Sequence, residues 1–315
     1  MSVAVFVRRV LAALLVMFLV SLLTFFLGRM VPGDPAEILA GDGASAETIA
    51  GIRSSLGLDR PILVQYGDWL YGATHGDLGV SLFSGQPVAD SISTAAPPTL
   101  SVSLLALVIA VAVGVSAGAV AGLNQGRWLD RVISGLSGVG IAIPGFWLAM
   151  VLISILTISN PWLPATGYEP LSAGIGPWLS HIIIPALALG LAAAAELARH
   201  TRGCVADVLD RPYIVAARAR GASGFWLVRK HVLRNAAIPV VTVVGLQFGR
   251  LLGGVVVVEA VCGVPGLGTL ATSAVLESDY PMIQAYVLLC AVVIVLVNLL
   301  TDVAYAVINP KLRAA

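Results

Sequence analysis

Six stretches of this chain are apolar enough, and long enough, to cross a bilayer as helices, which leaves little of the chain for any other fold. A spanning helix needs about 20 predominantly apolar residues. Stretches of that kind occupy residues 10–31, 99–123, 132–158, 178–197, 236–261 and 282–308. Hydrophobic residues make up 58% of the chain and charged residues only 11%, outside the usual range of soluble domains. The sequence therefore predicts an all-α integral membrane protein with six transmembrane helices.

Two of the predicted spans have unusual features. His181, Pro185 and Glu196 interrupt the fourth span, although neighbouring helices can satisfy a backbone that is broken in this way. The first span is longer than the apolar region of about 7 to 15 residues in a cleaved signal peptide. We therefore expect the first span to be retained as a membrane anchor. The ends of the fourth span are the hardest of the six to place from the sequence.

Lysine and arginine gather on one side of the predicted membrane. Fourteen of the 18 lie at the chain ends or in the loops that follow spans 2 and 4. Because these residues accumulate in short cytoplasmic loops, we expect both termini to be cytoplasmic. Three parts follow from this orientation: residues 1–31 with the first span, an external segment at 32–98, and a core at 99–315 with a cytoplasmic loop at 199–235.

Two spans carry a glycine at every fourth residue. These glycines are Gly114, Gly118 and Gly122 in span 2, and Gly245, Gly249 and Gly253 in span 5. Small-residue stripes let helix backbones approach closely, and close packing drives helix association in lipid. We expect both spans to lie inside a bundle or an oligomer.

Three ionisable residues within the spans stand out: Glu196, Arg250 and Asp302. Such residues are costly at membrane depth and usually face cavities or partners. Two interpretations of Arg250 stay open: it lines a polar pathway or pairs across a subunit interface, or it forms a purely structural ion pair. For Glu196 and Asp302, the simpler interpretation is a local hydrogen bond near the cytoplasmic interface.

The motifs of the chain argue against an enzyme. Residues 114–118 match the pattern GxSxG, but a serine nucleophile needs a nearby base, and the four histidines lie in loops or at span ends. Neither lysine follows a GxxxxGK[ST] phosphate loop, so a partner would have to hold any ATP. Cys204, Cys262 and Cys290 suggest no disulfide framework. We expect no catalytic residue, no cofactor or metal in this chain, and no nucleic-acid partner.

The loop between spans 4 and 5 is the main candidate for a functional site. Residues 207–232 are amphipathic and helix-prone around Gly221 and Gly224, which predicts a helix, a glycine turn and a second helix leading into span 5. Its aromatic and arginine residues are of the types enriched at interaction hot spots. The loop therefore fits either a groove on a soluble partner or a basic helix on anionic lipid. We name residues 213–232 the basic segment.

Residues 213–239, YIVAARARGASGFWLVRKHVLRNAAIP, resemble the coupling loop of ABC-importer permeases. The EAAxxxG pattern of that loop is matched by Ala216, Ala217 and Gly221, and Val215 stands in place of the acidic residue. The continuation RKHVLRNAAIP is similar to the form found in the dipeptide, oligopeptide and nickel permease family. Further strings of that family occur in order: VPGDPA, LGLDRPILVQY, GDLGVS, EAVCGVPGLG, DYPMIQA and VNLLTDVAYAVINPKLR. With its long external segment, the chain resembles the first permease of the pair that this family uses.

The resemblance implies a type I ABC-importer permease that moves peptides or a peptide-like ligand into a prokaryotic cell by alternating access. The implied partners are a second related permease, one or two ATPase subunits holding ATP and Mg²⁺, and a substrate-binding protein that meets residues 32–98 and 262–281. These would assemble at the plasma membrane, with lipid around the spans. The alternative is an ion-coupled secondary transporter, which would use Glu196, Arg250 and Asp302 as a charge relay without an ATPase.

The resemblance also assigns site residues. Those expected to act in ATPase coupling are Tyr213, Ala216, Ala217, Arg218, Arg220, Gly221, Phe225, Arg229, His231 and Arg234. The four arginines among them are expected to position the loop. Gln247 and Arg250 are the candidate residues of the translocation pathway.

Overall fold

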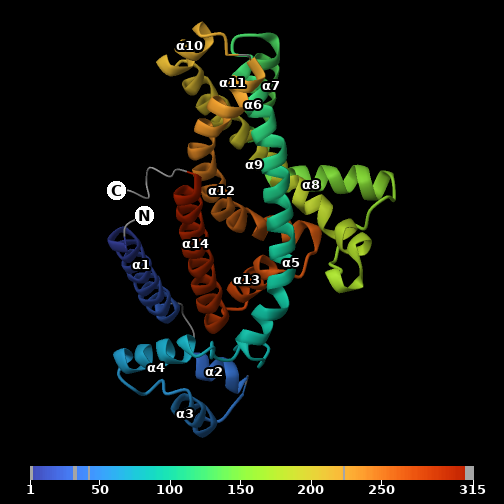
Figure 1. Cartoon of the computed structure of the whole chain (residues 1–315). Helices are drawn as coiled ribbons and strands as arrows, with labels where there is room; N and C mark the ends of the chain where they lie inside the picture. Colours follow the sequence, from blue (N-terminus) through green and yellow to red (C-terminus); the bar gives the residue numbers. More distant parts are fainter. Residues whose placement is uncertain (1–2, 31–33, 42, 223, 309–315) are drawn as a thin grey trace. The chain divides into compact units, whose positions relative to one another are not determined.

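The computed structural model describes residues 3–30, 34–41, 43–222 and 224–308, which form helices joined by short loops (Figure 1). The first helices in chain order are α1 (Val3–Met30), α2 (Pro35–Ala40), α3 (Ala46–Ser55), α4 (Ile62–Thr74), α5 (Val88–Ile109), η1 (Ala110–Val115), α6 (Ser116–Leu123), α7 (Trp128–Ala142), α8 (Gly145–Ile153) and η2 (Ser154–Ser159). They are followed by η3 (Leu171–Ala173), α9 (Ile175–Leu209), α10 (Pro212–Ala219), α11 (Gly224–Leu227), η4 (Val228–Val232), α12 (Leu233–Cys262), α13 (Leu267–Leu276) and α14 (Tyr280–Ile308). The all-α prediction is confirmed.

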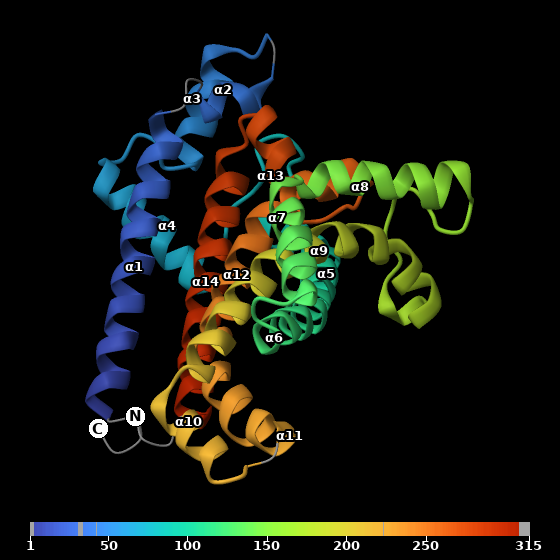
Figure 2. The ribbon, with the colours of Figure 1, turned by 90° about the horizontal axis from the view of Figure 1, so that it is seen from above.

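Five helical runs within the described part of the chain are long and apolar enough to cross a membrane. They are Val7–Gly28, Val88–Leu123, Ile175–Leu209, Val228–Cys262 and Tyr280–Thr301. A sixth span is present if α7 and α8, which meet at 94°, are counted as one bent span (Figure 2). The prediction of six spans therefore holds when the bent pair is counted as one span.

The third predicted span, residues 132–158, is not one straight helix, and this part of the prediction is wrong. α7 ends at Ala142, and Ile143 and Pro144 have extended backbone, with ψ of 121° and 135°. A proline has no N–H for the helical ladder and disfavours helical geometry in the preceding residue. The chain therefore turns sharply before α8 begins at Gly145.

The fourth span is longer and more regular than predicted. α9 continues from Ile175 to Leu209 through Pro185, so the expected limits of 178 and 197 are too narrow at both ends. Pro185 is buried among neighbouring helices. Packing of this kind stabilises a helix that lacks one backbone hydrogen bond.

The chain divides into two compact units. One consists of Pro98–Pro265 with Met1–Val3 and Leu296–Ala315. Within it, α9 packs against η1, α6, α7, α8 and α12. The core of this unit is rich in small side chains, including Ala106, Ala110, Ala186, Ala188 and Ala193. Such side chains allow helix axes to approach closely in a membrane protein.

The glycine stripe of span 2 forms the contact with α9. A Cβ at Gly114 would come within 2.7 Å of the Ala194 carbonyl oxygen, and a Cβ at Gly122 within 2.7 Å of Val205 Cβ. Real side chains do not tolerate such approaches, so the two backbones touch where only glycine fits. The predicted close packing of span 2 is confirmed.

The second unit consists of Ala4–Pro97 and Gly266–Val295. The Tyr66 hydroxyl on α4 and Ser21 Oγ on α1 are 2.8 Å apart in a hydrogen bond, and the Tyr66 ring packs edge-on against Phe25. Asp34 caps α2 by accepting from the Ala36 N–H at 3.0 Å, and Pro35 begins the helix. The segment at 32–98 thus contains the three short helices α2, α3 and α4.

Candidate functional site

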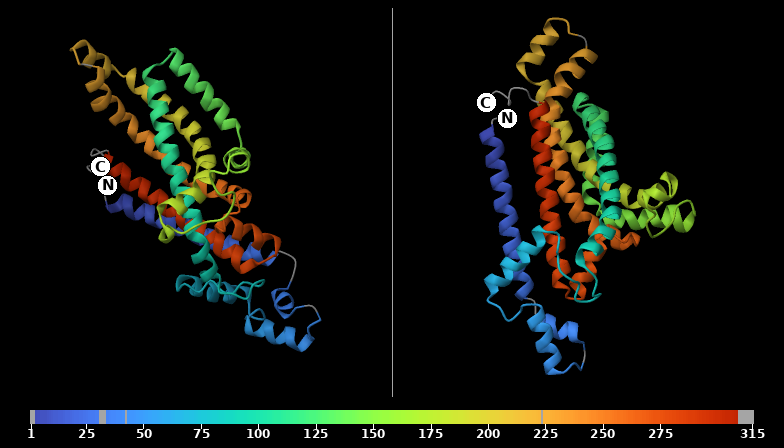
Figure 3. Two further views of the ribbon diagram at one scale, coloured as in Figure 1. Left: turned by 90° about the vertical axis from the view of Figure 1, so that its right-hand side faces the viewer. Right: turned by 60° about the horizontal axis from the view of Figure 1, so that its bottom comes forward.

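The basic segment forms short helices around a glycine turn, as the sequence predicts (Figure 3). α10 ends at Ala219, and Gly221 has a φ of +83°, a left-handed conformation that glycine adopts without strain. α11 and the π-helical turn η4 then lead directly into α12. The local folding of this segment is thus dictated by its glycines.

One face of the basic segment is anchored to α9 and α12. Ile214, Leu227 and Val232 are fully or almost fully buried in an apolar cluster with Val205 of α9 and Ala236 of α12. Burying an apolar side chain of this size contributes about 1.5–3 kcal/mol. The segment is therefore packed onto the spans and is not suspended on a linker.

The opposite face is exposed and carries most of the residues assigned to ATPase coupling. Tyr213 is 44% exposed, and the other exposed members are Ala216, Arg220, Arg229 and Arg234. Ala217 instead lies in the buried cluster, and His231 is half-buried. The side chains of Arg218 and Phe225 lie outside the described part of the chain. The exposed residues therefore form a basic, aromatic surface.

Part of this surface is hollowed around Trp226. A recess of about 420 Å³ is lined by Trp226, Arg229, Lys230 and Arg234. Lys230 Nζ lies 4.7 Å from the centre of the Trp226 ring. The centre of the His231 ring lies 5.1 Å from the centre of the Trp226 ring. Attraction between the cation and the ring face favours this arrangement. The structure thus brings Arg229, His231 and Arg234 together, with Tyr213 and Arg220 outside the recess.

The two candidate pathway residues line a different recess. It has a volume of about 340 Å³, with walls from α7, α8, α9 and α12 around Glu196, Gln247 and Arg250. Gln247 is 6% exposed, whereas the Arg250 side chain is 64% exposed. The two residues are therefore neighbours at one site, and their role in transport stays a prediction.

Arg250 forms an ion pair with Glu196, and His200 Nε2 lies 4.0 Å from the same carboxylate. Glu196 therefore bonds across to α12, and the simpler interpretation of a local bond alone is wrong. The side chain of Asp302 lies outside the described part of the chain. Charged side chains at membrane depth are costly against lipid. This face of the unit is therefore expected to meet an aqueous cavity or another protein chain.

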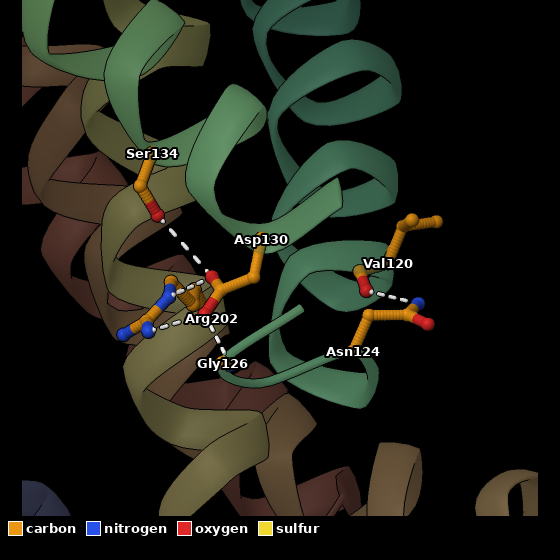
Figure 4. Close-up of polar contacts among 6 residues, drawn as sticks. All are labelled: Val120, Asn124, Gly126, Asp130, Ser134 and Arg202. Atoms are coloured by element: carbon orange, nitrogen blue, oxygen red, sulfur yellow. Dashed lines mark hydrogen bonds and ion pairs between the residues drawn. The ribbon is translucent and has the colours of Figure 1, made fainter. Parts of the chain in front are cut away.

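A second ion pair, not anticipated from the sequence, lies closer to the basic segment (Figure 4). Arg202 on α9 donates two parallel hydrogen bonds to Asp130 at the start of α7, that from Nη2 measuring 2.8 Å. The Gly126 N–H donates to the same carboxylate at 2.9 Å, and Ser134 Oγ donates at 3.3 Å. Asp130 is only 3% exposed. The protein itself therefore satisfies this carboxylate.

A further buried carboxylate lies near the end of α12. Glu259 has no exposed surface and accepts a hydrogen bond from Thr99 Oγ1 at 2.6 Å. The helix ends shortly afterwards at Cys262, and Gly263, with a left-handed φ of +59°, begins a turn within the string GVPGLG. Glu259 belongs to the family string EAVCGVPGLG, and no role of its own is predicted for its side chain. Its acidic side chain in an apolar run was the signal that could have singled it out.

In the second unit, a buried aspartate joins two stretches of sequence that the resemblance assigns to contact with a substrate-binding protein. Asp279 accepts hydrogen bonds from Ser81 Oγ and from the Leu82 N–H, the latter at 3.2 Å. It is 2% exposed. The external segment and the DYPMIQA motif are therefore fixed to each other within this unit.

Long apolar helices, a helical segment packed onto two of them, and an ion pair between α9 and α12 together define an integral membrane protein. Residues 110–314 match the family described as binding-protein-dependent transport system inner membrane component. Residues 2–103 match the N-terminal membrane component of the same systems. The chain belongs to this family, and the ion-coupled alternative is left without support.

Curated relatives match almost the whole chain. The glutathione transport system permease protein GsiC of Escherichia coli O6:H1 is 45% identical over 307 residues, covering 98% of each chain. The probable peptide ABC transporter permease protein y4tP of Sinorhizobium fredii is 39% identical over 306 residues, covering 97% of this chain and 98% of the relative. The chain is therefore similar in sequence and length to complete permease subunits.

A solved structure shares the fold. An inward-facing structure of the MetNI methionine ABC transporter matches with a TM-score of 0.55 at 19% identity, covering 69% of this chain and 96% of that chain. A second crystal form of the same transporter gives a TM-score of 0.52 at 20% identity. The predicted ABC-importer permease fold is confirmed.

Proposed function

We propose that this chain carries peptides or a peptide-like ligand into a prokaryotic cell as one permease subunit of an ATP-driven importer. The names of the relatives, which include glutathione and peptide permeases, support the substrate class. The observation that carries the coupling part of the proposal is the two-sided basic segment, packed on α9 and α12 and exposed with basic and aromatic side chains. A segment of this kind gives a soluble ATPase a rigid point of attachment to the spans.

ATP and Mg²⁺ bind in the partner ATPase subunits in this proposal, and closure of those subunits displaces the basic segment. The displacement reaches α9 and α12, since Ile214 and Val232 are packed against Val205. The same two helices carry Glu196 and Arg250 further along their length. The recess around these residues therefore changes shape as the helices rock, which opens the pathway alternately to each side.

A second, related permease chain completes the pathway. Arg250 supports this, because its 64% exposed side chain would otherwise face lipid at membrane depth. A substrate-binding protein delivers the ligand to the external segment, which Asp279 holds against the DYPMIQA motif. The complex resides in the plasma membrane, with both termini and the basic segment in the cytoplasm.

Purification and reconstitution test the proposal. The chain is purified from its native membrane in mild detergent, and the proteins that accompany it are identified by mass spectrometry. We expect ATPase subunits and a second permease, and liposomes containing the complex should import radiolabelled glutathione or trialanine only when ATP is supplied. A stable homodimer without ATPase, or uptake driven by an ion gradient without ATP, would contradict the proposal.

Gly221 offers a specific test of the basic segment. A Cβ at this position would meet no described atom within 4 Å, so a substitution strains the backbone without causing a clash. Left-handed geometry costs most residues about 1–2 kcal/mol, so we expect Gly221→Val to deform the turn and lower uptake per ATP hydrolysed. Gly221→Asn is the matched control, because Asn tolerates this conformation. Wild-type uptake per ATP in Gly221→Val would count against the role of the segment.

A further inference from the structure

We propose that Asp130 and Arg202 are positioning residues that transmit movement of the basic segment to the wall of the recess around Arg250. The inference rests on the proposed function, because it takes the basic segment as the point where the ATPase acts. In this role the two residues touch neither substrate nor nucleotide. They act by holding α7 in a fixed relation to α9.

Arg202 lies on α9 next to the residues that anchor the basic segment. It lies less than one turn before Val205, which packs in the apolar cluster that anchors the basic segment. A Cβ at Gly122 of α6 would come within 2.9 Å of the Arg202 carbonyl oxygen and 2.7 Å of Val205 Cβ. The end of α9 is therefore contacted by α6, α7 and the basic segment within about one turn.

The second step is the rigidity of the ion pair. The Asp130 carboxylate accepts two bonds from Arg202, one from the Gly126 N–H and one from Ser134 (Figure 4). Paired parallel hydrogen bonds between guanidinium and carboxylate fix orientation as well as distance. Gly126 belongs to the turn between α6 and α7, with a φ of +77°. The ends of α6, α7 and α9 are thus joined into one block.

The third step is the reach of α7. It contains 15 residues and is therefore about 22 Å long at 1.5 Å per residue. At its far end Ile141, and beyond the sharp turn Gly145 and Phe146, line the recess that contains Arg250. α7 also touches α9 near that end, where a Cβ on Gly140 would lie 2.8 Å from Ala195 Cβ. A displacement of α9 therefore carries α7, and with it one wall of the recess.

A purely structural ion pair would stabilise the fold without affecting the efficiency of transport. Breaking a buried pair by removing one partner is strongly destabilising in general, so stability alone does not separate the two roles. The number of substrate molecules imported per ATP hydrolysed does separate them. That ratio falls when movement is lost between the basic segment and the recess, and it is independent of the amount of folded complex.

The test uses the complete complex in liposomes, with radiolabelled glutathione and trialanine as probes. We expect Asp130→Asn and Arg202→Ala to lower uptake per ATP by about tenfold, within the range found along coupling networks. Asp130→Glu and Arg202→Lys keep the charges and should recover part of the ratio. Arg202→Lys also supplies the measurement if Asp130→Asn is not recovered in folded form. The matched control is Ser137→Ala, about two turns along α7 from Asp130, buried, and outside the pair.

An unchanged ratio in Asp130→Asn and Arg202→Lys, in a complex that imports with ATP, would overturn the inference and leave the proposed function intact. A smaller amount of assembled complex with an unchanged ratio in the complex that does assemble would also overturn it, because the pair would then be structural. A wild-type complex that does not require ATP would instead contradict the proposed function itself. The two failures are therefore distinguishable.

Discussion

The glycine stripe of η1 and α6 and the stripe of α12 share a four-residue spacing but differ in their surroundings. In the first stripe, a Cβ at Gly114 or Gly122 would approach atoms of α9 to 2.7 Å. In the second, a Cβ at Gly249 or Gly253 would meet no atom of the described chain within 4 Å. Gly245 resembles the first stripe, since its Cβ would lie 3.0 Å from Thr301 Cγ2 on α14.

The difference shows that the spacing of small residues predicts a smooth helix face without predicting what covers it. In the first stripe the covering helix belongs to the same chain. In the second, the open glycines share α12 with the exposed charge of Arg250, which is costly against lipid. An open glycine face beside such a charge fits the second permease chain that we propose as partner.

Gly118→Leu should have the largest effect, because it tests the covered stripe. A Cβ at Gly118 would already lie 2.6 Å from Thr201 Cβ, and overpacking of this kind costs about 3 kcal/mol or more for a large side chain. We expect a large fall in the Tm of the chain purified in detergent. An unchanged Tm would show that α9 does not cover this stripe. Gly249→Leu adds the same volume to the open stripe and is the matched control.

Gly249→Leu should act on assembly more than on stability. The new side chain has open space and leucine is favoured over glycine inside a helix, so the isolated chain should lose no stability and gain up to about 1 kcal/mol. Close approach of a second helix would be prevented, since the leucine holds the backbones apart. The measurement is the ratio of the two permeases recovered on an affinity tag. Full recovery of the second permease would place its contact elsewhere.

Gly253→Ala should have the smallest effect and the opposite sign to Gly114→Ala. Alanine is favoured over glycine inside a helix by up to about 1 kcal/mol, and the structure offers it no clash at position 253. We expect an equal or slightly higher Tm for Gly253→Ala and a lower Tm for Gly114→Ala. The same sign for both would remove the distinction between the stripes.

Much of the fold follows from local properties of the sequence. Apolar length is a property of a single stretch, and α1, α5 with α6, α9, α12 and α14 each overlap a predicted span. The turn at Gly221 is equally local, because it depends on one residue that tolerates positive φ. The placement of the basic segment between two spans could therefore be predicted well before any contact was known.

The ion pairs could not be predicted in this way. Asp130 and Arg202 are 72 residues apart, and Glu196 and Arg250 are 54 apart. Several arginines lie on the same predicted side of the membrane as each carboxylate. Each of these arginines was a possible partner. The choice depends on how α7, α9 and α12 pack, which no local pattern determines.

Prolines limit the prediction of helix ends in a different way. The turn after α7 has a clear signal in Pro144, which interrupts the helix there. Pro185 and Pro239 lie inside α9 and α12 without ending them. A proline thus weakens a helix by a similar amount at each site, and the neighbouring helices decide whether the helix continues.

The π-helical turn η4 (Val228–Val232) joins α11 of the basic segment to α12. A π-helical turn contains additional chain compared with an α-helical turn. That additional residue is accommodated within the turn, whereas deletion of one residue from the regular α-helix between Leu233 and Gln247 would rotate everything beyond it by about 100°. Gln247 and Arg250 would then face away from the recess that they line with α9. The alignment between the basic segment and the recess is therefore encoded as a residue count, which substitutions preserve and a one-residue deletion within α12 destroys.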